Sequence, residues 1–151
     1  MVAASESLVW LCVRNNNAFL KKKNGKTSRS GAVHFSTEKG NIKSISSFKY
    51  SGLANNKTVD VTADITGSNT ATATLSKKTN AASSKPKAGA ADTPINKHFR
   101  KVEKIILSQT VDNYYRPDLK SAALAKWSAV YRSNRVAKGV KKAVPIKKGR
   151  H

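Results

Sequence analysis

Residues 58–75 read Thr58-Val-Asp-Val-Thr-Ala-Asp-Ile-Thr-Gly-Ser-Asn-Thr-Ala-Thr-Ala-Thr-Leu75, and this stretch decides the fold. Apolar side chains alternate with Thr and Asp on both sides of the turn sequence at 67–69. Such alternation is typical of a strand with one buried face, and a short Gly-containing loop joins antiparallel neighbours. The stretch therefore predicts a β-hairpin with one apolar face.

Upstream of the hairpin, the sequence predicts a short helix. Ser5 fits the N-cap, and Leu8, Leu11 and Cys12 recur at the i, i+3, i+4 spacing of one helix face. We expect Cys12 to be a small core residue on that face, because a buried thiol behaves as a small apolar side chain.

Two further strands are predicted between that helix and the hairpin. One begins at 18–20 and is followed by a turn at 21–25, and 26–40 shows little periodicity. The other covers 45–50, where Phe48 and Tyr50 share one face and Lys49 points the other way.

Downstream, residues 76–91 are rich in Ala, Ser, Lys, Gly and Pro, which predicts a flexible connection at about 76–92. Thr93 and Pro94 fit the cap and first position of a helix that buries Ile95, Phe99, Val102 and Ile106. A second helix is predicted from Pro117. Its buried face carries Leu119, Ala122, Ala123, Trp127, Val130 and Tyr131.

The predicted fold class is α+β: a short N-terminal helix, a small antiparallel sheet with a hairpin, two C-terminal helices and a basic disordered tail. We expect one domain over 1–135 and a basic extension over 136–151, whose composition offers no apolar face to bury.

The net charge of the chain limits the kinds of partner that it can bind. The chain of 151 residues has 29 Lys and Arg against 8 Asp and Glu, a formal charge of +21. Such an excess favours a polyanionic partner, foremost nucleic acid and second an anionic membrane surface. The single cysteine cannot form an internal disulfide, and the sequence has no zinc-ligand spacing. Its longest apolar run, 8–13, is far too short to span a bilayer, and residues 1–7 lack the basic start of a signal peptide, so we expect an intracellular protein.

No constellation in the sequence supports catalysis. His34, His98 and His151 are widely separated, and neither GxGxxG nor GxxxxGK[ST] occurs. The sequence therefore predicts neither an enzyme nor a cofactor.

The basic runs are candidate RNA-binding sites, although each could also be a solvated turn or tail. Phosphate neutralisation by such cations would release counterions and make binding salt-dependent. The tail could equally be a nuclear import signal. The candidate RNA-binding residues are Arg14, Lys21, Lys22, Lys23, Lys49, Lys57, Arg100, Lys101, Lys104, Tyr114, Tyr115, Arg116, Lys120, Arg132, Arg135, Lys141, Lys142, Lys147, Lys148 and Arg150.

Among these, Arg116 is singled out because Pro117 biases its backbone to an extended conformation, which suits a phosphate clamp. The alternative is an internal ion pair with Asp112 or Asp118. The rings of Tyr114 and Tyr115 could stack on unpaired bases or pack internally; Phe48 and Tyr50 carry the same two alternatives, with core packing favoured.

Three stretches carry a family resemblance. They are Ser7-Leu-Val-Trp-Leu-Cys-Val-Arg-Asn15 followed by Phe19-Leu20; Ser47-Phe-Lys-Tyr-Ser-Gly-Leu53 continuing through Lys57-Thr-Val59; and Tyr115-Arg-Pro-Asp-Leu119 continuing through Ala122-Ala123 to Arg132-Ser133. Together they resemble the eukaryote-specific large-subunit ribosomal protein family numbered twenty-eight. The resemblance covers roughly 5–61 and 94–135, and the chain departs from the family pattern at 22–43 and in the Thr/Ala-rich hairpin.

The resemblance implies an α+β structural component of the cytosolic 60S subunit, assembled via the nucleolus. It implies contact with rRNA, including eukaryote-specific expansion segments on the solvent side, and with neighbouring large-subunit proteins. It implies no membrane, small-molecule substrate or homo-oligomer. A free chromatin or DNA-binding protein is the alternative that the charge alone would allow, followed by a membrane-surface protein.

Overall fold

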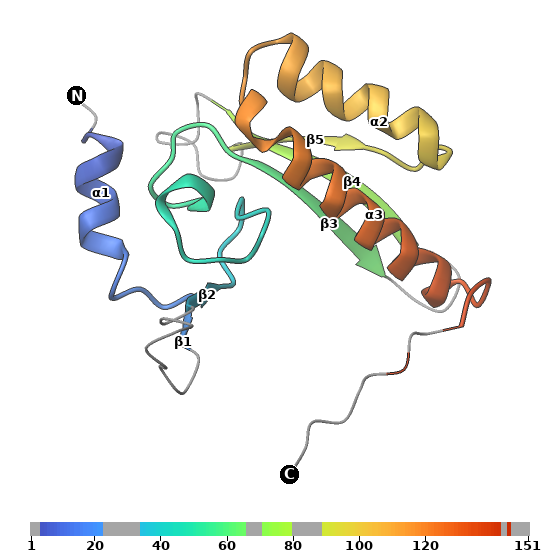
Figure 1. Ribbon diagram of the computed structural model, residues 1–151, viewed down its shortest axis with the longest axis horizontal. Coiled ribbons are helices and arrows are strands. Elements are labelled where there is room, and N and C mark those ends of the chain that lie inside the picture. The colour runs from blue at the N-terminus through green and yellow to red at the C-terminus, as the bar shows by residue number, and fades with distance from the viewer. Residues whose placement is uncertain (1–3, 23–33, 66–70, 80–88, 143–144, 146–151) are drawn as a thin grey trace.

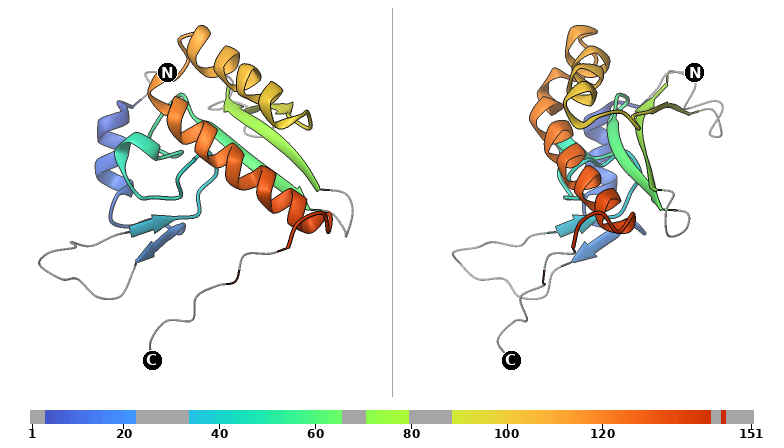
Figure 2. Two further views of the ribbon diagram at one scale, coloured as in Figure 1. Left: turned by 45° about the vertical axis from the view of Figure 1, so that its right-hand side comes forward. Right: turned by 90° about the vertical axis from the view of Figure 1, so that its right-hand side faces the viewer.

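The computed structural model describes residues 4–22, 34–65, 71–79, 89–142 and 145. A three-stranded antiparallel sheet has the strand order β3 (Val59–Ile65), β4 (Ala71–Lys78), β5 (Ala90–Pro94). One face of this sheet carries two helices, α2 (Phe99–Leu107) and α3 (Lys120–Ala137) (Figures 1 and 2). The N-terminal helix α1 (Glu6–Val13) and a two-stranded sheet of β1 (Leu20–Lys22) and β2 (His34–Ser36) lie beside this unit (Figure 1). The predicted α+β class is confirmed.

The predicted hairpin is confirmed as β3 (Val59–Ile65) and β4 (Ala71–Lys78). The register pairs Val61 with Leu75 and Ala63 with Ala73, so the apolar set lies on one face. Val61 and Leu75 are fully buried under the helices. Alternation of side chains across the pleat thus buries the apolar set and leaves Thr and Asp on the opposite face.

The flexible connection predicted at about 76–92 is wrong at both ends. β4 continues to Lys78, and a third strand, β5 (Ala90–Pro94), pairs with it through Lys77–Ala91 and Leu75–Thr93. β5 is an edge strand of small and polar residues held by backbone hydrogen bonds, so no apolar alternation marks it in the sequence. Residues 80–88 lie outside the described ranges.

The predicted helix start at Thr93 and Pro94 is also wrong. Pro94 ends β5, where an edge position tolerates a residue without an N–H. The chain then continues extended, with the Ile95 N–H donating to the Ala73 carbonyl at 2.9 Å, and α2 covers Phe99–Leu107. Ile95 is buried as expected, but it packs from this link rather than from a helix.

The second predicted helix is confirmed. A 3₁₀ turn at Pro117–Leu119 leads into α3, Lys120–Ala137. Trp127 is 3% exposed and its ring stacks on Phe99 at 6.0 Å, with Tyr131 at 5.5 Å. The Trp127 indole N–H donates to the Phe99 carbonyl at 3.3 Å, so the one polar atom of the buried ring has a partner. Phe99 itself remains 38% exposed, less buried than predicted.

The N-terminal helix forms as predicted but buries a different face. α1 is Glu6–Val13, and the Ser5 hydroxyl accepts from the Leu8 N–H at 3.3 Å. Cys12 is exposed, so its prediction as a core residue is wrong. Half-buried Trp10 and Val9 lie on the inner face instead. Both faces of this helix are apolar, so the pattern could not show which one packs.

Between α1 and β3, the strand predicted to begin at 18–20 is present from Leu20, whereas the turn predicted at 21–25 and the strand predicted at 45–50 differ from the structure. β1 (Leu20–Lys22) pairs with β2 (His34–Ser36), so Lys21 and Lys22 are in a strand rather than a turn. The predicted strand at 45–50 is instead a 3₁₀ turn, Phe48–Tyr50, preceded by an isolated bridge from Ile45 to Phe35. None of the helices in the described ranges is both long and apolar enough to span a bilayer.

Candidate nucleic-acid interface

Lysine side chains lie against the rings of two tyrosines, Tyr50 and Tyr115. The ammonium groups of Lys43 and Lys49 lie 5.2 and 5.8 Å from the centre of the Tyr50 ring. The Lys57 ammonium lies 5.7 Å from the centre of the Tyr115 ring. These separations suit cation–π attraction. We call these five residues the tyrosine–lysine cluster; all three lysines are exposed, so their charges face solvent.

The hydroxyl of Tyr115 holds the ring in place through two hydrogen bonds to the backbone. It donates to the Lys78 carbonyl at 2.7 Å and accepts from the Thr58 N–H at 3.2 Å. Burial raises the pKa of the Tyr115 hydroxyl, against the opposing effects of its backbone hydrogen bonds and of the Arg116 charge. Tyr115 therefore ties the loop before α3 to β3 and β4, and its ring is only partly available to a base.

Arg116 makes an internal clamp. Its Nε and one terminal nitrogen donate to the two Asp118 carboxylate oxygens at 2.8 and 2.9 Å. The terminal nitrogens also donate to the Lys57 carbonyl at 2.7 Å and the Lys49 carbonyl at 2.9 Å. The side chain is 15% exposed. Of the two alternatives, the structure has the internal pair with Asp118, and four of the five guanidinium N–H groups are engaged.

The same clamp sets the charge of Asp118. A hydrogen bond from Arg116 lowers the pKa of the Asp118 carboxyl, partly opposed by burial, and the Arg116 and Lys49 charges add to the lowering. Asp118 is thus ionised at neutral pH and offsets one cation beside the cluster. Arg116 thus links the backbone carbonyls of Lys49 and Lys57 through one guanidinium group.

Tyr114 differs from its neighbour. Tyr114 is 84% exposed, and its φ of 48° lies in the left-handed region that non-glycine residues rarely adopt. A π-helical turn at Ser108–Asp112 precedes it, and its N–H donates to the Val111 carbonyl at 2.9 Å. The ring therefore stands out from the surface on a defined backbone, where an unstacked base could reach its face.

The outer face of α2 is basic. Arg100, Lys101 and Lys104 are all exposed, while Val102 and Ile106 on the opposite face are fully buried. The helix is thus divided along its length into a core side and a cationic side.

On α3, the predicted cations Lys120, Arg132 and Arg135 are exposed as well. The Arg135 guanidinium carbon lies 6.0 Å from the centre of the Tyr131 ring. Because α2 and α3 lie side by side on one face of the sheet, both present cations from the helical layer (Figure 2).

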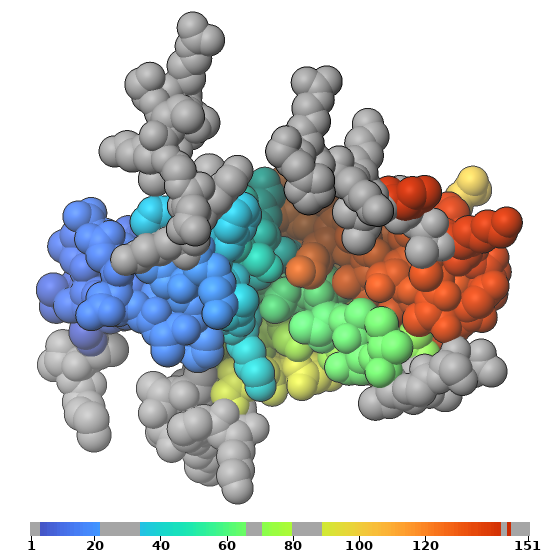
Figure 3. Space-filling view, turned by 90° about the horizontal axis from the view of Figure 1, so that it is seen from below, coloured from blue at the N-terminus to red at the C-terminus, as the bar shows by residue number. Residues whose placement is uncertain are grey.

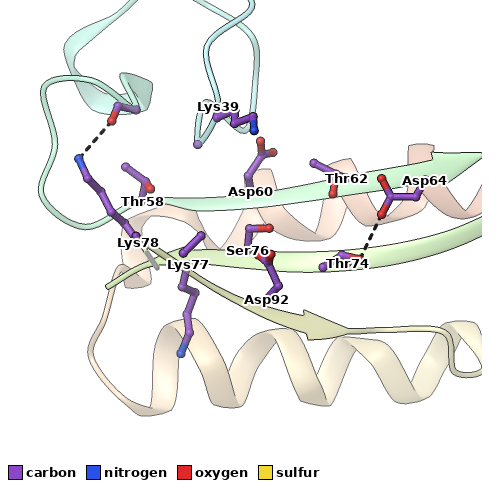
Figure 4. A pocket seen from close by; sticks show the side chains of 14 residues that line it. Lys39, Thr58, Asp60, Thr62, Asp64, Thr74, Ser76, Lys77, Lys78 and Asp92 are labelled. Carbon is purple, nitrogen blue, oxygen red and sulfur yellow. Dashed lines mark hydrogen bonds between the residues drawn. The ribbon is translucent and has the colours of Figure 1, made fainter. Parts of the chain in front are cut away.

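The opposite face of the sheet has another character. Asp60 and Asp64 of β3 and Asp92 of β5 lie there, three of the 8 carboxylate side chains in the chain, with Thr62, Thr74 and Ser76 between them (Figure 4). Together with Lys39 and Lys78 they line a groove of about 780 Å³. The Lys78 ammonium is tied to the Asn55 carbonyl at 3.0 Å. Three aspartates thus line the groove with three lysines, Lys39, Lys77 and Lys78, so this face lacks the cationic excess of the helical layer and is less suited to nucleic acid.

The remaining candidate residues that the structure describes do not join the cluster. Arg14 follows α1 and Lys21 lies in β1. The N-terminal segment (blue) lies at the opposite end of the molecule from the end of α3 (red) in Figure 3. Lys141 and Lys142 are exposed beyond α3. The side chain of Lys22 and residues Lys23, Lys147, Lys148 and Arg150 lie outside the described residues.

Sequence reasoning missed Lys43 and Lys77. Lys43 joins the cluster through an irregular loop. Lys77 lies on the core side of β4, with its ammonium 5.5 Å from the Tyr115 ring and hydrogen-bonded to Gln109. No periodic signal could have placed either against a tyrosine.

These observations define a class: a small basic α+β protein whose cations sit on a helical layer and around two tyrosines. The described residues contain no group of three or more His, Cys, Asp or Glu side chains that could hold a metal ion. The profile of the Ribosomal L28e protein family matches residues 8–133.

Named relatives agree with the profile. The large ribosomal subunit protein eL28 of Dictyostelium discoideum is 34% identical over 134 residues, 89% of this chain and 92% of that protein. That of Schizosaccharomyces pombe is 31% identical over 140 residues, 92% of this chain and 99% of that protein. That of Caenorhabditis elegans is 49% identical over 63 residues, 42% of this chain and 46% of that protein.

The chain belongs to the Ribosomal L28e protein family. It is a structural, non-enzymatic constituent of the large ribosomal subunit, which confirms the family and function expected from the three motifs. Membership of the subunit implies rRNA and other ribosomal proteins as its partners in general.

Proposed function

We propose that the chain stabilises rRNA in the large subunit of the cytosolic eukaryotic ribosome, including eukaryote-specific expansion segments on the solvent side. The observation that carries the proposal is the family match over residues 8–133, which spans nearly the whole described structure. Assembly through the nucleolus, contact with neighbouring large-subunit proteins and the absence of self-association are parts of the same proposal.

The proposed contacts are mainly with phosphate and ribose. The major groove of A-form RNA is too deep and narrow for side chains to read, so exposed ammonium and guanidinium groups meet the backbone first. The helical layer and the tyrosine–lysine cluster supply such groups, and Tyr114 supplies a ring for an unstacked base. The proposed RNA-binding set is that of the sequence analysis, with Lys43 added and Arg116 assigned to positioning.

A sedimentation experiment tests the proposal. The endogenous protein should appear in the large-subunit and polysome peaks of a sucrose gradient after a moderate-salt wash. Recovery with chromatin alone would overturn the ribosomal assignment in favour of a DNA-binding protein. Cross-linking of the gradient fractions with ultraviolet light should then map adducts to Tyr114 and to the cluster, and a map confined to the Asp60–Asp64 face would contradict the proposed surface.

A further inference from the structure

α1 has two apolar faces, and only one of them packs against the residues that the structure describes. The inner face carries Glu6, Val9, Trp10 and Val13, all half-buried. The Trp10 ring lies 6.1 Å from that of Phe48, and the Glu6 carboxylate accepts from the Asn56 N–H at 2.7 Å. These contacts fix which way the helix faces.

The outer face is apolar and open. Leu8 is 55% exposed and Leu11 is 59% exposed, and exposed Cys12 lies beside them at i+3 and i+4 spacing. Within the described residues, no part of the chain covers these three side chains. Scattered apolar residues on a surface are ordinary, but here three adjacent ones make up the outer side of a helix, with Ser7 as the other exposed residue of α1.

The chemistry of this face excludes a phosphate backbone as its occupant. Elsewhere this chain of +21 presents ammonium and guanidinium groups, whereas the exposed positions within α1 (Ser7, Leu8, Leu11 and Cys12) carry no charge. Exposed Arg14 follows the helix at its C-cap. Aliphatic side chains gain nothing from phosphate, and base stacking uses aromatic rings or guanidinium planes. Of the two partner types found in a ribosomal subunit, RNA and protein, only protein offers a matching apolar surface.

Size excludes a second copy of this chain. A helix of 8 residues is about 12 Å long. Three side chains on it fall far short of the about 800 Å² per partner that a stable dimer buries. So small a contact forms only where something else holds the two partners together, and a shared rRNA scaffold does so by raising their effective concentration.

We propose that the outer face of α1 docks into an apolar groove on a neighbouring large-subunit protein, with Leu8, Leu11 and Cys12 as anchors. In this mode of recognition a helix lies in a groove of its partner, and the side chains at positions i, i+3 and i+4 of the helix contact that groove. The proposal rests on the ribosomal function above and adds to it the location and chemistry of a protein contact.

Cys12 is the single cysteine of the chain, which makes it a reporter for this face. A maleimide should label Cys12 readily in the free folded protein and at least tenfold more slowly in purified large subunits. Labelling at the same rate in both would overturn the proposal. Absence of the chain from large subunits would overturn both this proposal and the proposed function, whereas its presence there with Cys12 fully reactive would overturn only this one.

Photo-leucine incorporated in place of leucine identifies the occupant in intact subunits. Adducts from Leu8 or Leu11 should map by mass spectrometry to one other large-subunit protein. Adducts to nucleotides, adducts to a second copy of this chain, or no adducts would each contradict the proposal.

A double variant, Leu8→Ser with Leu11→Ser, should be lost from subunits several-fold more readily in a salt wash. Its unfolding midpoint as a free protein should stay unchanged. Leu53→Ser is the matched control, because Leu53 is an exposed leucine (39%) on a different segment. Equal retention of the double variant and this control would again overturn the proposal.

Discussion

Arg116 joins the segment before α3 to the carbonyls of Lys57 and Lys49, 59 and 67 positions away in the chain, so its removal should affect both segments. Arg116→Ala should lower the free energy of unfolding by about 2–3 kcal/mol, because charge-assisted hydrogen bonds to Asp118 and to the carbonyls of Lys49 and Lys57 are lost together. Arg116→Lys should recover less than half of that loss, since one ammonium cannot reproduce the planar fork. Chemical denaturation monitored by tryptophan fluorescence measures both.

Binding data separate this positioning role from direct phosphate contact. If Arg116 acts through the loops, Arg116→Ala should weaken RNA binding only as far as it disturbs Lys49 and Lys57. A loss of affinity with unchanged stability would instead show that Arg116 touches the RNA.

Tyr115 offers a test that depends on pH. Its pKa is raised by burial in the folded state, so the stabilisation it gives is present below the pKa of an unfolded tyrosine and is lost as pH rises through the folded value. Tyr115→Phe should cost about 1–2 kcal/mol at neutral pH, because the Lys78 carbonyl and Thr58 N–H lose their partner. The variant should also lose stability less steeply above about pH 10 than the parent chain. Parallel slopes of unfolding free energy against pH would contradict this account.

The sequence alone could not decide which partners some single residues contact, because those partners lie far away in the chain. For Arg116, both a phosphate clamp and an Asp118 pair were open, and two carbonyls 59 and 67 positions away in the chain decided the outcome. No local pattern reports contacts of that separation. Cys12 shows the same limit, because helical spacing places it with Leu8 and Leu11 but does not say which face the rest of the protein covers.

At the scale of elements, the period of the apolar residues correctly predicted the helices and strands that have one apolar face. It did not predict a strand that is held only by backbone hydrogen bonds. The hairpin at β3 and β4 and the core face of α3 follow from alternation and helical spacing. β5 has no apolar alternation, and its backbone pairing with β4 cannot be predicted from the order of its side chains. Pro94 then misled the prediction, since its fixed φ suits an edge strand as well as the first turn of a helix.

The aromatic contact between α2 and α3 provides the test at this scale. Trp127→Ala should lower the free energy of unfolding by about 3–5 kcal/mol, because the ring is 3% exposed and packs between Phe99 and Tyr131. Thermal unfolding followed by circular dichroism measures the loss. Tyr131→Phe is the control: it keeps the ring beside Trp127 and should cost far less. A nearly neutral Trp127→Ala would mean that the two helices do not depend on this contact.

At the scale of the whole molecule, charge is divided between faces rather than spread evenly. The helical layer carries Arg100, Lys101 and Lys104 with the α3 cations. On the opposite face of the sheet, Asp60, Asp64 and Asp92 balance the lysines that line the groove. A polyanion should therefore approach from the helical side and from the tyrosine–lysine cluster. The total of +21 could be read from the sequence, but this division could not, because it depends on which face of the sheet the helices cover.

Salt dependence measures that division. Replacing Arg100, Lys101 and Lys104 together by Gln should weaken binding to large-subunit rRNA fragments. It should also reduce the slope of log K against log salt by about 2–3, since each phosphate contact contributes about 0.7–0.9 to the slope. Gln keeps the helical propensity, so α2 should survive the change, and circular dichroism checks this.

Asp60→Asn with Asp64→Asn and Asp92→Asn is the matched triple on the opposite face. It changes the net charge by the same number of units in the other direction but removes no proposed phosphate contact, so its salt slope should equal that of the parent chain. If RNA instead binds across the sheet, the acidic-face variant would gain affinity because three repulsive charges are lost, while the α2 variant would leave the slope unchanged. Fluorescence anisotropy at four or more salt concentrations distinguishes the two outcomes, because the slope counts contacts whereas a single affinity does not.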